Sequence, residues 1–139
     1  RGTALVAYLA SLGADTVPAR LAAAAAWRPD SRVPLAPAAA TQLFQRLCSP
    51  CHGVGGRGDG PLATRLILRP GDWQVAPFRH VPPQEEPEVA LSRIIKFGLP
   101  GLTMAGHEYL ADAEIVGLAR HVRLLHHEVD RGSAAIPSP

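Results

Sequence analysis

The chain has few aromatic residues, a single lysine, little net charge and no long apolar run. Only 5% of its 139 residues are aromatic, so a bare hydrophobic core would be thin. Almost all of its positive charge is arginine, with Lys96 as the single lysine, and the net charge of +2 is too small to indicate nucleic-acid binding. The longest apolar run, at residues 21–27, is too short to span a membrane, and no signal peptide is evident. No acid–base pair or nucleophile cluster indicates an active site, so we do not expect an enzyme.

The two cysteines stand together in the pentapeptide Cys48-Ser49-Pro50-Cys51-His52. Cys-x-x-Cys-His is typical of c-type haem attachment, in which two thiols bind the porphyrin edge and the histidine binds iron. A thioredoxin-like motif would follow a strand, whereas residues 41–47 have helical spacing. A zinc site would need further ligands, and there is no other cysteine. The motif therefore predicts one covalent haem c held by Cys48, Cys51 and His52.

The single methionine, Met104, is the predicted second iron ligand. It lies in a loop at residues 98–106 that is too rich in glycine and proline for a helix interior. A thioether opposite an imidazole raises the haem potential and suits electron transfer. His80 and His107 are rival ligands, and a loop methionine that simply covers the core is the remaining alternative.

These residues resemble a class I cytochrome c domain of the bacterial type, in which Cys-His-Gly is followed by Gly-x-Gly-Asp-Gly-Pro. The matching segments are Cys51–Gly53, Gly56–Ala63, Leu68–Trp73 and the methionine loop, and the resemblance covers residues 37–128. It implies an all-α class I fold with three main core helices around one haem, which would supply apolar area that the chain lacks. It also implies that the Pro61 carbonyl accepts a hydrogen bond from His52. Trp73 is expected to donate its indole N–H to a haem propionate, with a plain core role as the alternative.

The predicted elements follow the hydrophobic pattern along the chain. Residues 1–13 form an N-terminal helical extension that resembles the closing helix of another cytochrome domain, and residues 14–36 form an Ala/Pro-rich connector that Trp27 pins to the surface. A helix at 38–47 faces inward through Ala40, Leu43, Phe44 and Leu47, and a short helix follows at 61–68. A helix at 87–97 faces inward through Val89 or Ala90, Ile94 and Phe97. The last helix starts at Asp112 as its N-cap, buries Ile115, Leu118, Val122 and Leu125, and gives way to a tail at 129–139.

Two residues where the first and last core helices cross depart from what the family leads us to expect. Ala40 supplies a small residue where the family often has glycine, and His121 stands where the family tends to have an aromatic residue. We interpret His121 as structural, and His126 and His127 as a solvated helix end.

The predicted function is electron transfer through a single haem with His52 and Met104 as axial ligands. We expect the chain to be a domain or subunit of a respiratory oxidoreductase, such as the c-type subunit of a cbb3-type oxidase, located in the periplasm or on the periplasmic face of the inner membrane. Its partners would be donor and acceptor redox proteins and another haem domain of the same parent chain. A stand-alone periplasmic carrier is one alternative, and binding or sensing of a diatomic gas by displacing Met104 is another.

Overall fold

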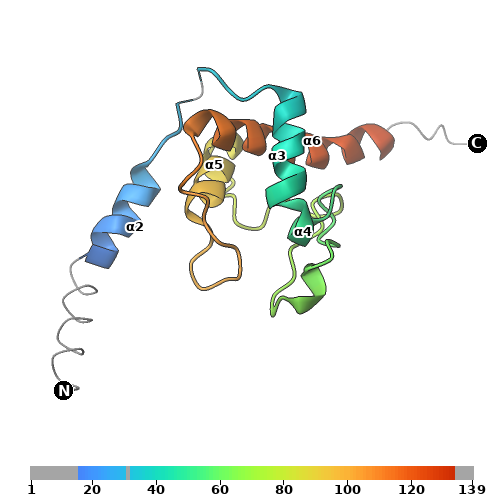
Figure 1. Ribbon diagram of the computed structural model, residues 1–139, viewed down its shortest axis with the longest axis horizontal. Coiled ribbons are helices and arrows are strands. Elements are labelled where there is room, and N and C mark those ends of the chain that lie inside the picture. Colours follow the sequence, from blue (N-terminus) through green and yellow to red (C-terminus); the bar gives the residue numbers. More distant parts are fainter. Residues whose placement is uncertain (1–15, 31, 134–139) are drawn as a thin grey trace, which may run out of the picture.

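Helices make up all the regular structure of the described chain, which covers residues 16–30 and 32–133 of this computed structural model. No strand occurs in that part, so the all-α prediction is confirmed. Figure 1 shows α3, α5 and α6 gathered into one body, with α2 extending away from it. The elements are α2 (Thr16–Ala26), α3 (Pro37–Leu47), α4 (Ser49–His52), the 3-10 turn η1 (Ala63–Arg65), α5 (Pro87–Phe97) and α6 (Asp112–Ser133). No described helix has the length and apolarity that a membrane crossing requires.

Two predicted helices are confirmed and two predicted boundaries need correction. The helices at 38–47 and 87–97 are confirmed. The expected helix at 61–68 shrinks to η1, because Leu66 already has an extended backbone. The predicted tail begins too early, since α6 continues to Ser133. The helix expected at 3–12 lies outside the described residues.

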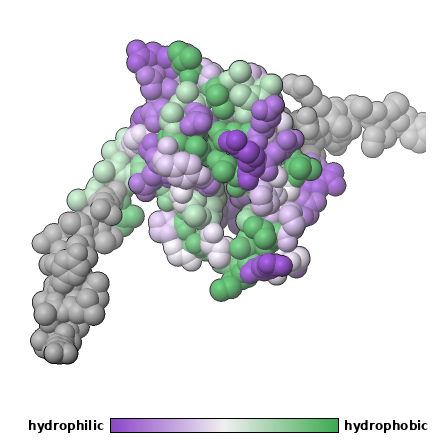
Figure 2. Space-filling model, viewed as in Figure 1, coloured by the Kyte–Doolittle hydropathy of each residue, from purple (hydrophilic) through white to green (hydrophobic). Residues whose placement is uncertain are grey.

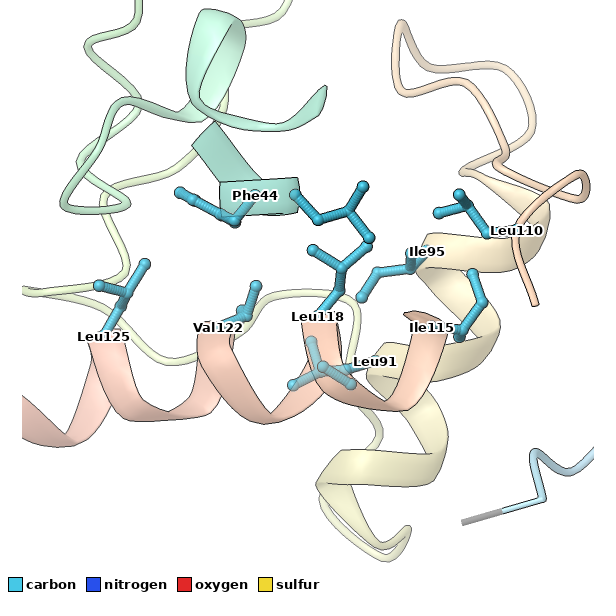
Figure 3. Packing of buried hydrophobic residues seen from close by; sticks show 10 residues of the cluster. Phe44, Leu91, Ile95, Leu110, Ile115, Leu118, Val122 and Leu125 are labelled. Atoms are coloured by element: carbon cyan, nitrogen blue, oxygen red, sulfur yellow. The ribbon is translucent and has the colours of Figure 1, made fainter. Parts of the chain in front are cut away.

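The core joins the inward faces of α3, α5 and α6 (Figure 3). On α3 and α6 the predicted stripes are confirmed: Phe44, Ile115 and Leu118 are completely buried. On α5 the stripe is rotated from our prediction. Leu91 and Ile95 are buried with Ala90, whereas Ile94 and Phe97 are only half-buried.

Helix α6 begins with a capping arrangement one residue earlier than predicted. The Ile115 N–H bonds to the Ala111 carbonyl, so Ala111 rather than Asp112 is the N-cap. Glu114 reaches back to accept a bond from the Ala111 N–H at 2.9 Å, as in one half of a capping box. Asp112 is thereby free to accept from the Asp30 N–H and from Lys96, which ties the connector to the helical body.

Helices α3 and α6 cross at a point where side chains are small on both helices. A Cβ placed on Gly117 would lie 3.4 Å from the Ala40 Cβ and 2.7 Å from the Leu35 Cβ. The small residue predicted at the crossing is therefore one of a pair, and Gly117 is the more constrained member. His121, one turn further along, packs its ring 4.7 Å from that of Phe44 and lies 3.3 Å from the Thr41 hydroxyl. This agrees with its structural interpretation.

Trp27 docks the connector on α5, as predicted. Its ring meets Phe97 edge-on with centroids 5.7 Å apart, and the Lys96 ammonium lies 4.9 Å from its centre. Arg93 donates to the Ala25 carbonyl at 3.1 Å. The alanine-rich part of α2 before Trp27 is mostly exposed, so the connector is docked mainly at its Trp27 end.

The crossing gives a stability prediction. Gly117→Val should lower the free energy of unfolding of the haem-loaded protein by about 1–3 kcal/mol through overpacking, although valine has the better helix propensity. Denaturant titration measures the change. Gly71→Val is the matched control, because a Cβ there meets nothing within 4 Å. Equal stability of the two variants would contradict the close crossing.

Candidate haem site

The Cys-x-x-Cys-His pentapeptide forms a single helical turn at the end of α3. Cys48 ends α3, with its N–H bonded to the Phe44 carbonyl at 2.8 Å, and is also the N-cap of α4. Cys51 and His52 then follow within one turn. Both cysteines are free and half-buried, so the two thiols are not consumed by a disulfide. Burial, reinforced by Cys51, raises the pKa of the Cys48 thiol to about 12, which keeps it protonated.

The chain returns onto α4 and satisfies its last carbonyl groups. The N–H groups of Gly58, Gly60 and Leu62 bond to the carbonyls of His52, Cys51 and Pro50, at 2.9, 3.3 and 2.8 Å in turn. A helix of four residues leaves such carbonyls without partners of its own. The glycine-rich segment after the motif is therefore a clamp on the haem-bearing turn.

Gly60 is the tightest point of that clamp. A Cβ there would lie 2.4 Å from both the Pro50 and the Ser49 carbonyl oxygens, which are backbone atoms with little room to move. Only a residue without a side chain allows this approach.

In the described part of the chain, the His52 ring is neutral and partly unpaired, as an iron-binding imidazole needs to be. Burial, with a smaller contribution from His107, lowers its pKa to about 4, so the ring is neutral and can offer a lone pair. Its Nδ1 is buried and has no hydrogen-bond partner among the described residues. The hydrogen bond that His52 was expected to donate to the Pro61 carbonyl is thus not formed in this structure, where Pro61 is exposed.

Trp73 holds the His52 ring by stacking. The two rings lie 4.5 Å apart at an angle of 25°. Gly56 leaves the space for the indole, because a Cβ there would lie 2.5 Å from a ring carbon of Trp73. The contact with His52 was not predicted from the sequence, which suggested only a propionate or core role for this tryptophan.

His126 supports Trp73 from α6. Its Nδ1 donates to the Trp73 carbonyl at 2.6 Å, and its ring lies 4.9 Å from that of Phe78. The interpretation of His126 as part of a solvated helix end is therefore wrong, since it is half-buried. Its position four residues after Val122 on the buried stripe was the signal that could have revealed this.

Met104 lies on a loop closed by backbone contacts. The Leu99 N–H bonds to the Met104 carbonyl at 3.1 Å, and His107 donates its N–H to the Lys96 carbonyl at 2.9 Å. Gly98 has a φ of 72°, and a Cβ there would lie 2.6 Å from the Met104 carbonyl oxygen. The Met104 side chain is half-buried. This loop and the segment containing α4 and η1 both lie below the helical body in Figure 1. A 3.4 Å hydrogen bond from the Thr103 hydroxyl to the Leu68 carbonyl links them.

The rival ligands differ in their surroundings. His107 is half-buried, and its Nδ1 lies 3.2 Å from the Ile95 carbonyl, which directs the ring against the end of α5. His80 is exposed on the loop before α5. Of the two, only His107 influences His52 electrostatically.

The comparisons with known proteins agree with this geometry. The profile of the family described as "Cytochrome c" matches residues 37–125. Among solved structures, a chain of the Kuenenia stuttgartiensis reducing HAO-like protein complex is similar in fold. Its TM-score is 0.55 at 22% identity, and the match covers 72% of this chain and 46% of that one. No curated protein matches the sequence.

The chain belongs to the cytochrome c family. Family membership implies a covalently attached haem c, and Cys48 and Cys51 have the attachment spacing. The site fits this group: it offers two free thiols and a neutral imidazole. The haem supplies one-electron redox chemistry, and His52 and Met104 would hold its iron.

The attachment prediction concerns the thioether bonds. In acid and denaturant the haem should stay with the polypeptide, because covalent bonds survive unfolding. Mass spectrometry should show the apoprotein mass plus about one haem. Release of free haem under these conditions would contradict attachment through Cys48 and Cys51.

A second prediction assigns the distal ligand. Met104→Ala should abolish the weak long-wavelength absorption of an iron–methionine bond and lower the reduction potential, because a thioether ligand that raises it is lost. His107→Ala is the control and should keep the absorption band. If the band instead survives in Met104→Ala, the thioether assignment is wrong.

Proposed function

We propose that this haem-based electron-transfer module serves a larger respiratory oxidoreductase, such as a cbb3-type oxidase, as a domain of its c-type subunit. It works at the periplasmic face of the inner membrane. Electrons pass between its haem and a second haem domain in the same parent chain. Other redox proteins act as the donor and acceptor.

The docked connector is the observation that carries this proposal. Two haems in one chain exchange electrons only if they are held close together, which a freely moving linker does not ensure. Here Trp27 packs on Phe97, Arg93 bonds to the Ala25 carbonyl, and the Asp30 N–H bonds to Asp112 at 3.2 Å. These contacts fix the end of α2 on the helical body.

The exposed part of α2 is available to a neighbouring domain. Its alanines are mostly exposed, and Leu21 is 54% exposed, so the helix has an apolar surface that the described residues do not cover. The similar solved chain, named as part of a reducing HAO-like protein complex, offers a precedent for this fold in a larger redox assembly.

The residues around the site suit outer-sphere electron transfer. His52 and Met104 would hold the haem iron, and the haem would supply one-electron transfer. Trp73 and the clamp at Gly58, Gly60 and Leu62 keep His52 in one orientation. A rigid ligand set limits structural change between the two oxidation states and thereby speeds the transfer.

The reading frame of the parent gene tests the tandem arrangement. We expect at least one more Cys-x-x-Cys-His motif upstream of Arg1, behind a membrane anchor. A start codon and signal peptide directly before Arg1 would contradict the proposal and favour a stand-alone periplasmic carrier. Rapid binding of carbon monoxide by the reduced protein at neutral pH would instead favour gas binding with a displaceable Met104.

A further inference from the structure

A short lobe beside the haem-bearing turn combines exposed apolar and cationic side chains. This η1 lobe comprises residues 61–70, and its Leu62 N–H bonds directly to the Pro50 carbonyl within the Cys-x-x-Cys-His turn. Its large aliphatic side chains are turned to solvent: Leu62 is 42% exposed, Leu68 57% and Ile67 93%. Figure 2 shows hydrophobic surface gathered on the lower part of the molecule, where Figure 1 places η1.

The positive charge of the lobe is not compensated by the described residues. Arg65 and Arg69 are exposed and form no ion pair there, and no acidic residue occurs between Asp59 and Asp72. Among the other arginines whose side chains are described, Arg46, Arg57 and Arg79 also form no ion pair with a described residue, whereas the rest pair with carboxylates. Arg93 pairs with Glu85, Arg120 with Glu88, and Arg123 with both Glu86 and Glu88.

The η1 lobe also contacts the loop that carries Met104. The Thr103 hydroxyl on the methionine loop donates to the Leu68 carbonyl at 3.4 Å. A partner seated on the lobe would thus lie against the attachment turn and near the loop that carries Met104. This short path is what electron transfer between two proteins requires.

We propose that the η1 lobe is the docking surface for a redox partner whose own surface is acidic with an apolar centre. This inference rests on the proposed electron-transfer function. Arg65 and Arg69 steer the acidic surface during approach, and Ile67 with Leu68 buries apolar area once contact is made. An anionic membrane is the other surface that such a lobe could meet. The position of the lobe next to the haem-bearing turn favours a protein that exchanges electrons.

Stopped-flow oxidation of the reduced holoprotein tests the docking. The probe is an acidic blue-copper protein, and a small inorganic oxidant serves in a parallel series. Arg65→Glu and Arg69→Glu should each lower the second-order rate constant with the acidic protein roughly tenfold at low ionic strength, and the difference should shrink as salt is added. Ile67→Ser should lower the rate at high salt as well, since its contribution is not screened.

Arg32→Glu is the matched control. It makes the same charge change on an exposed side chain, which pairs with Asp30 in the segment between α2 and α3. Figure 1 shows this segment on the opposite side of the helical body from η1. At about 0.1 M ionic strength, where the Debye length is about 10 Å, it should slow the reaction much less than the lobe variants do, because charges beyond that length are largely screened. If Arg32→Glu slows the reaction as much as Arg65→Glu, the effect is one of net charge and the docking surface is wrong.

The remaining outcomes separate this inference from the function on which it rests. Unchanged rates with the acidic protein in all lobe variants, while the small oxidant still reacts, would overturn the docking surface and leave electron transfer intact. Failure of the wild-type holoprotein to react even with the small oxidant would overturn the proposed function itself. Sedimentation with anionic phospholipid vesicles that is lost in Ile67→Ser, with unchanged protein rates, would assign the lobe to a membrane and overturn the proposal.

Discussion

The structure depends on how one helical turn is held so that it presents two thiols and an imidazole together. A four-residue helix such as α4 is not stable alone, because nucleation is costly and its carbonyl groups lack internal partners. The returning chain supplies those partners from Gly58, Gly60 and Leu62. Since Gly60 must approach the carbonyls of Ser49 and Pro50, the position does not accept a side chain. The same backbone hydrogen bonds that satisfy the carbonyl groups of α4 therefore also hold the two thiols and the imidazole in place.

The rest of the fold positions the loop that carries Met104, the predicted second ligand, and links this loop to the segment after η1. Helix α5 ends at Gly98, whose lack of a side chain lets the methionine loop fold back on the helix end. Phe97, directly before that glycine, is also the residue on which Trp27 docks. The connector and the Met104 loop thus share one short segment of α5.

The sequence predicts well what depends on local pattern and poorly what depends on packing. The helices of the core and the α6 stripe follow from periodicity, because this signal is short-range. The assignment of the iron ligands remains a prediction from motif spacing and loop composition. The Trp73 stack on His52 joins segments that no local pattern connects, and the role of His126 depends on that stack. Gly117 was missed for a similar reason, as its importance appears only when α3 and Leu35 lie against it. The buried face of α5 was mispredicted for the same reason. Phe97 contacts Trp27 of the connector, and no local pattern in the sequence reveals that contact.

Near-infrared magnetic circular dichroism of the oxidised holoprotein tests the central claim most directly, because it identifies the pair of axial ligands on the haem iron. The account predicts a low-spin, six-coordinate iron with one histidine and one methionine ligand, supplied by His52 and Met104. A spectrum of two histidine ligands, or of a high-spin iron with an open position, would contradict it.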